Sequence, residues 1–92
     1  MANHKSALKR AMQSEERRQR NRARKTRMKS VVKAVEEAVA SSNKELAVAK
    51  LKKAVSVIDK TASKGVIHKT KAARKISRLS RHVNDLVSAP SV

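Results

Sequence analysis

The chain of 92 residues contains no cysteine and no aromatic residue, and it has one glycine and one proline, Gly65 and Pro90. The absence of cysteine excludes disulfides, thiolate metal sites and thiol chemistry. The absence of Phe, Tyr and Trp excludes the aromatic platforms on which RNA-recognition and oligonucleotide-barrel domains stack bases. Apolar runs are short, as at residues 38–40, so we expect neither a membrane-spanning helix nor a secretory signal.

Acidic residues are scarce as well. The chain has 7 Asp and Glu against 24 Lys and Arg, which gives a net charge of +17. Residues 1–30 carry 11 basic and 2 acidic side chains and residues 64–92 carry 7 and 1, whereas residues 31–63 carry 6 and 4. A charge of this size indicates a polyanionic partner and says little about the fold.

The densest positive charge lies between Lys9 and Arg27, with Ala23 as the only apolar residue from position 17 onward. Such a segment repels itself and has no apolar face to bury, so we expect it to bind a nucleic acid through phosphates. Contacts of this kind are largely blind to sequence. When a protein makes six to ten of them, its affinity falls by about 10³–10⁵ as the salt concentration rises from 50 to 200 mM. The candidate contacts are Arg17, Arg18, Arg20, Asn21, Arg24, Lys25 and Arg27.

The rest of the pattern is helical, because Ala, Lys, Arg and Glu are abundant and no period-2 alternation occurs. A first helix is predicted from about Ser6 to Ala40, with an apolar stripe at Met28, Val31, Val32, Val35, Ala38 and Val39. Ser42 and Glu45 form a predicted capping box for a second helix that ends near Thr61. Its buried face is predicted at Ala47, Leu51, Val55, Ile58 and Ala62.

Gly65 is predicted to stop the second helix in a left-handed conformation. The third helix should begin at residues 67–70 and end before Ala89-Pro90, and its predicted stripe is Ala72, Ala73, Ile76, Leu79, Val83, Leu86 and Val87. Short connections favour an all-α, up-down-up three-helix bundle with the long basic N-terminal helix extending beyond the core. Residues 1–92 are then one domain, with a basic helical arm for nucleic-acid binding at 1–27, the bundle at 28–88 and a tail at 89–92.

This topology should return the second helix to the neighbourhood of residues 20–25, since its 20 or so residues span about 30 Å. The third helix would start there, and its basic residues would join the arginine-rich arm in one patch. These residues are Lys64, His68, Lys69, Lys71, Arg74 and Lys75.

No pattern of catalysis is present. Ser80, His82 and Asp85 have the composition of a catalytic triad, but they lie on one amphipathic helix with no second element to orient them. The three histidines lack metal-ligand spacing, and no glycine-rich phosphate loop occurs. We therefore expect no enzyme, no metal and no cofactor.

Two stretches carry a resemblance to a known family. The start MANHKSALKR and the later run KGVIHKTKAARKISRL resemble the bacterial small-subunit ribosomal protein numbered twenty (S-twenty), and the likeness covers essentially the whole chain. It implies a three-helix bundle that binds small-subunit ribosomal RNA at the 5′ domain and the 3′ minor domain. Thr70 stands where the family pattern has Asn.

The first stretch implies RNA contacts by Asn3, Lys5, Ser6, Lys9 and Arg10. The second stretch implies RNA contacts by Lys64, His68, Lys69, Lys71, Arg74 and Arg78. In the same stretch the resemblance implies a structural turn at Gly65 and close packing at Ala72 and Ala73.

The function predicted from residues and resemblance together is a cytoplasmic, structural constituent of the small ribosomal subunit, with no membrane, small-molecule substrate or homo-oligomer required. One alternative is a nucleoid-type protein that binds DNA without specificity, which a preference for structured RNA would exclude. Another is a membrane-surface or acidic-protein binder that uses the arm as an amphipathic helix, for which large apolar residues opposite the charges are missing. We also expect residues 1 to about 25 to be frayed without RNA and helical with it.

Overall fold

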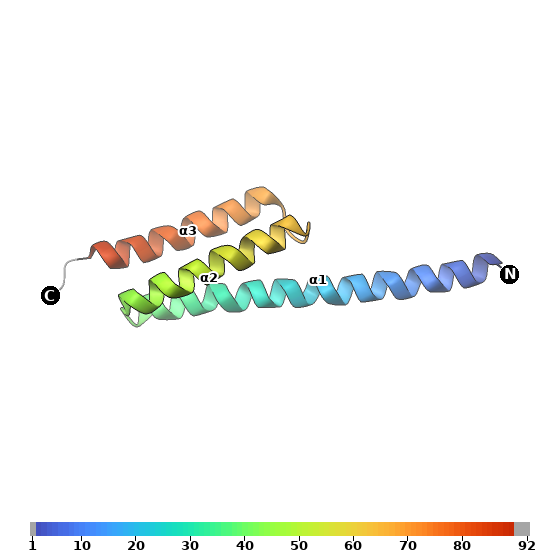
Figure 1. Cartoon of the computed structure of the whole chain (residues 1–92), viewed down its shortest axis with the longest axis horizontal. Helices are drawn as coiled ribbons and strands as arrows, with labels where there is room; N and C mark the ends of the chain where they lie inside the picture. Colours follow the sequence, from blue (N-terminus) through green and yellow to red (C-terminus); the bar gives the residue numbers. More distant parts are fainter. Residues whose placement is uncertain (1, 90–92) are drawn as a thin grey trace.

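The computed structural model describes the backbone of residues 2–89 and the side chains of residues 4–89. Within that range it contains three helices and no strand: α1 (Ala2–Ala40), α2 (Lys44–Ser63) and α3 (Lys69–Ser88). They run up, down and up (Figure 1), so the predicted fold class is confirmed. The start of α1 lies before the predicted Ser6, and Pro90, predicted to follow α3, lies outside the described residues.

The molecule is far longer than it is wide, with extents of 74 × 22 × 14 Å. Its radius of gyration is 18.5 Å, against about 12 Å for a compact chain of this length. The cause is α1, whose 39 residues span about 58 Å, whereas α2 and α3 span about 30 Å each. The N-terminal half of α1 therefore projects beyond the other two helices, as Figure 1 shows.

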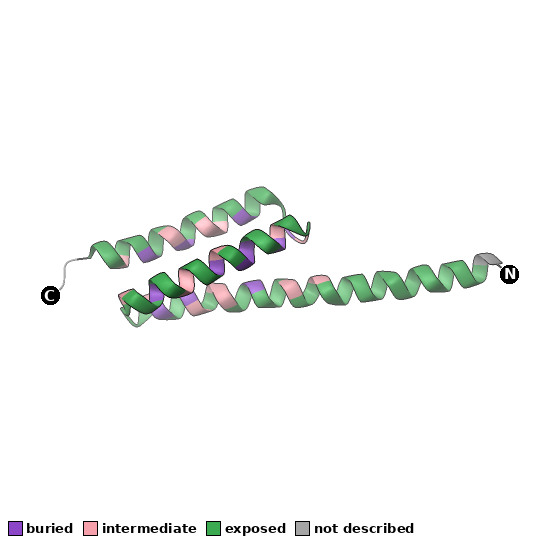
Figure 2. Ribbon diagram, in the orientation of Figure 1, coloured by how far each residue is buried: buried purple, intermediate pink, exposed green. Residues whose placement is uncertain are grey.

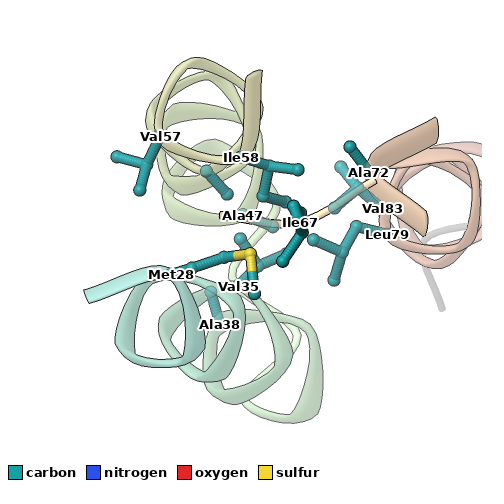
Figure 3. Packing of buried hydrophobic residues seen from close by; sticks show 11 residues of the cluster. Met28, Val35, Ala38, Ala47, Val57, Ile58, Ile67, Ala72, Leu79 and Val83 are labelled. Carbon is teal, nitrogen blue, oxygen red and sulfur yellow. The ribbon is translucent and has the colours of Figure 1, made fainter. Parts of the chain in front are cut away.

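A small aliphatic core lies where the three helices meet, with the side chains converging from all of them (Figure 3). Val35 and Ile58 are fully buried at its centre. The other core residues are Met28, Ala38, Ala47, Ala54, Val57, Ile67, Ala72, Leu79 and Val83. Small side chains dominate, so the helices approach closely while each buries little apolar area. The predicted stripes of α1 and α3 are largely confirmed, except that Ala73 and Val87 are exposed.

The buried face of α2 differs from its predicted stripe. Ala54, Val57 and Thr61 are buried although the sequence pattern did not mark them. Leu51, Val55 and Ala62, which it did mark, are only half-buried. The reason is that α2 packs against both neighbours and turns its most buried side towards α1, while open grooves of about 510 and 750 Å³ remain between α2 and α3.

The turn between α1 and α2 shows that the predicted capping box of Ser42 and Glu45 is wrong. Ser42 does not cap α2, because it adopts a left-handed backbone (φ 58°) that ends α1. The N–H groups of Ser42 and Asn43 donate to the carbonyls of Val39 (3.0 Å) and Ala38 (3.2 Å), the pair of bonds that defines a Schellman motif. Asn43 has the extended backbone that an N-cap needs, and its side-chain oxygen accepts a hydrogen bond from the Leu46 N–H at 3.1 Å.

The end of α2 uses the same motif with glycine in the left-handed position. Gly65 has φ +76°, as predicted, and its N–H donates to the Ala62 carbonyl at 2.9 Å. The following N–H, from Val66, donates to the Thr61 carbonyl at 3.2 Å. Ile67 then enters the core and fixes where α3 begins.

Candidate nucleic-acid interface

The N-terminal half of α1 forms a free-standing basic helix. Every side chain from His4 to Arg20 is exposed, and Figure 2 shows this half of α1 exposed throughout. Burial begins only at Asn21 and Arg24, where α1 reaches the bundle. No Gly or Pro interrupts the segment, and it is helical in this structure although nothing packs against it. The cationic side chains consequently point into solvent around the whole circumference of the helix.

The arm neutralises almost none of its own charge. The single ion pair among residues 4–89 joins Arg18 Nη2 to Glu15 Oε1 at 3.0 Å. The hydrogen bond and charge of Arg18 lower the pKa of the Glu15 carboxyl. Both side chains are well exposed, and a pair of this kind contributes little to stability. The remaining cations of the arm are available to an anionic partner.

A second basic feature appears where the arm enters the bundle. Arg24 and Arg27 of α1 and Lys60 and Lys64 of α2 line one hollow of about 110 Å³, whose other lining residues are Val57 and Thr61. Thr61 is 4% exposed, and its hydroxyl donates to the Val57 carbonyl at 2.8 Å. We call these four cations and the space between them the α1–α2 hollow.

The third basic feature lies on the outer side of α3. Arg74, Arg78 and Arg81 line a shallow surface there together with Thr70, Ala73 and Ser77. All six are exposed, and spacings of three and four residues place the arginines on one face of the helix. Small and hydroxyl side chains between the arginines would let a phosphate backbone approach closely.

The single patch predicted from topology is thus divided. Lys64 does lie beside Arg24 and Arg27. Lys69 lies instead in a groove between α2 and α3, and Arg74 lies on the outer face of α3. The division follows from the loop of residues 64–68, which carries the chain across the bundle before α3 starts.

The remaining predicted contacts are exposed or lie outside the description. Lys5, Ser6, Lys9, Arg10 and Lys71 are exposed, whereas the side chain of Asn3 lies outside the described residues. His68 is the N-cap of α3: its Nδ1 accepts a hydrogen bond from the Thr70 N–H at 3.1 Å. The imidazole of His68 therefore caps α3.

Sequence reasoning missed two members of these surfaces, Lys60 and Arg81. Lys60 precedes Lys64 by four residues and therefore shares its helix face. Arg81 follows Arg74 by seven residues, two helical turns. Helical spacing alone would have grouped Lys60 with Lys64 and Arg81 with Arg74. It would not have placed Lys60 beside Arg24 and Arg27 of α1.

Other kinds of site receive no support. Within the described residues no group of His, Asp and Glu could hold a metal ion. No helix over residues 2–89 is apolar over a length that could cross a membrane. His82 and Asp85 are exposed on α3, and neither makes a side-chain hydrogen bond in the part of the chain that the structure describes.

Comparison with known proteins gives a consistent result over nearly the whole chain. The model of the family "Ribosomal protein S20" matches residues 2–84. Small ribosomal subunit protein bS20 of Syntrophobacter fumaroxidans is 69% identical over 86 residues, which cover 94% of this chain and all of the relative. The bS20 proteins of Oleidesulfovibrio alaskensis and Trichlorobacter lovleyi are 60% and 57% identical over 86 residues, 94% of this chain and 99% of each relative. The chain therefore belongs to the ribosomal protein S20 family.

Proposed function

We propose that this protein is a structural, non-enzymatic constituent of the bacterial small ribosomal subunit that binds the small-subunit ribosomal RNA directly and supports its assembly in the cytoplasm. The family supports the place in the small subunit. Direct RNA binding is supported by the chemistry of the surface. The proposed contacts are the predicted residues of the arm together with those of the segment 64–78.

One observation carries the proposal: side chains 4–20 of α1 are exposed without exception while the net charge of the chain is +17. A helix held by packing would bury a stripe, and this half of α1 buries none. Its like charges repel one another, so order is gained when phosphates replace the counterions. A long, narrow cationic helix can enter between RNA segments, where its whole circumference makes contact.

The resemblance narrows the RNA to two regions, the 5′ domain and the long helix of the 3′ minor domain. Two separate basic features, the arm and the outer face of α3, suit contact with more than one RNA segment. No aromatic residue is available for base stacking. Recognition would therefore depend on the position of phosphates and on the shape of the RNA.

The test is a salt-titrated competition with purified protein. Labelled 5′-domain RNA is challenged with excess transfer RNA and with duplex DNA over 50–200 mM salt. We expect the 5′-domain complex to persist at moderate salt when both competitors are present. Equal competition by all three would favour the nucleoid-type alternative and contradict the proposal.

A matched pair of variants distinguishes the contribution of the arm to RNA binding from the contribution of net charge. Arg17→Gln with Arg20→Gln removes two charges from the arm, and Lys52→Gln with Lys53→Gln removes two exposed charges from α2. The arm variant should lower the slope of log affinity against log salt by about 1–2, because each phosphate contact contributes roughly 0.7–0.9. The α2 variant should change it little.

A further inference from the structure

We propose that the α1–α2 hollow is a binding site for a single phosphate group of the RNA backbone. This inference rests on the proposed function and adds to it a discrete site built from two helices. Most of the basic surface is open, and a phosphate there would meet one side chain at a time. In the hollow, four cationic residues of α1 and α2 line one small space together with Val57 and Thr61.

The size of the space suits a single group. At about 110 Å³, it is well below the roughly 300–1,000 Å³ of small-molecule pockets. It is also smaller than the grooves of about 510 and 750 Å³ between α2 and α3. Val57 and Thr61, both nearly buried, belong to its lining. The space can therefore take a tetrahedral oxyanion, whereas a nucleoside would be too large.

Arg24 has an unusual position among the arginines. It is half-buried, while every other arginine of residues 4–89 is exposed. No carboxylate pairs with it, since Glu15 and Arg18 form the single ion pair of the described residues. A guanidinium without a carboxylate partner can donate charge-assisted hydrogen bonds to a bound anion. Its planar fork suits a phosphate in particular.

The lysines of the hollow are not occupied by the end of α2. Cations near a helix C-terminus often serve its unpaired carbonyls. Here backbone N–H groups fill that role: Lys64, Gly65 and Val66 donate to the carbonyls of Lys60 (3.1 Å), Ala62 (2.9 Å) and Thr61 (3.2 Å). The ammonium groups of Lys60 and Lys64 consequently keep their donors for a ligand.

The test is a double-mutant cycle on binding of the 5′-domain RNA by the full chain. Arg24→Gln and Lys60→Gln lie on different helices and are measured singly and together. If both hold the same phosphate, each single variant raises Kd by roughly tenfold. The double variant then raises Kd far less than the 100-fold product, because the second cation has lost its shared ligand. Lys52→Gln serves as the control and should raise Kd little.

The inference would be overturned if the increase in Kd of the double variant equalled the product of the two single increases. It would also be overturned if neither single variant raised Kd more than Lys52→Gln does. Unchanged thermal unfolding of each variant, followed by circular dichroism, confirms that the bundle is intact. A second experiment adds inorganic phosphate to the protein without RNA at fixed ionic strength and measures its thermal unfolding. Stabilisation by phosphate without coupling in RNA binding would assign the hollow to a free anion and not to the RNA backbone. If the unaltered protein failed to bind the RNA at all, the proposed function itself would fall.

Discussion

Ile58 is the side chain on which the stability of the bundle should depend most. It is fully buried and lies at the centre of the cluster where the three helices meet (Figure 3). No aromatic residue supplements this core, and a small aliphatic core in a chain of this size gives a net stability of about 3–5 kcal/mol. A single large-to-small change can therefore remove most of it.

The loss can be worked out from the atoms removed. Ile58→Ala deletes three carbon atoms, which is about 2.4 kcal/mol of transfer free energy at about 0.8 kcal/mol for each methylene group. The cavity left behind adds to this, and such substitutions cost about 2–5 kcal/mol in total. Ile58→Val deletes one carbon and should cost about 0.5–1.5 kcal/mol.

Thermal unfolding followed by circular dichroism at 222 nm measures both changes. Ile58→Val should lower Tm by about 4–8 °C for each kcal/mol lost. Ile58→Ala should abolish the cooperative transition or leave it near room temperature. Leu46→Ala is the control, because Leu46 is 41% exposed and its loss should change the stability by about 0.5 kcal/mol or less.

Binding to RNA should partly rescue the core variant. RNA at 100 times its Kd stabilises the folded state by about 2.7 kcal/mol, which is comparable to the loss in Ile58→Ala. The cooperative transition should then reappear in the complex. If Ile58→Ala without RNA melted within a few degrees of Leu46→Ala, the cluster would not be what holds the bundle, and the reasoning would be refuted.

Four further predictions concern the helix ends and the arm. Ser42→Gly should raise stability by about 0.5–1 kcal/mol, because glycine relieves the left-handed backbone at some cost in unfolded-state entropy. Gly65→Ala should lower the stability by about 1–2 kcal/mol. The whole cost comes from the left-handed backbone, because a Cβ at this position would meet no atom within 4 Å. Both variants are measured by thermal melts, and a lower Tm for Ser42→Gly or a higher Tm for Gly65→Ala would contradict the reasoning. The arm is helical in this structure, but in the free protein it should fray, because its like charges repel one another and nothing packs against it. Residues 1–25 should therefore gain helix on RNA binding, and a circular-dichroism signal equal to the sum of the free components would count against this. Arg24→Glu with Arg27→Glu should leave the thermal transition nearly unchanged yet weaken RNA binding strongly in a filter-binding assay; intact binding would show that this end of the arm is not part of the interface.

Much of the fold followed from local sequence. The scarcity of Gly and Pro predicted three helices, and the apolar spacing predicted the buried faces of α1 and α3, because periodicity is a property of each helix alone. Gly65 marked the end of α2 for a similarly local reason. The capping box failed because two residues competed for the turn: Ser42 ended α1 in a left-handed conformation, which left Asn43 to cap α2.

The sequence by itself determined the helical character of the protein and indicated the class of its partner. A net charge of +17 with a helix segment that has no apolar stripe favours an anionic partner, whatever the bundle looks like. Only the tertiary structure decided which distant cations lie together. Burial of Val57 and Thr61 follows from how α2 is rotated against α1, and the same rotation brings Lys60 and Lys64 to Arg24 and Arg27. That rotation depends on the packing of three helices at once, and the period of a single helix does not contain it.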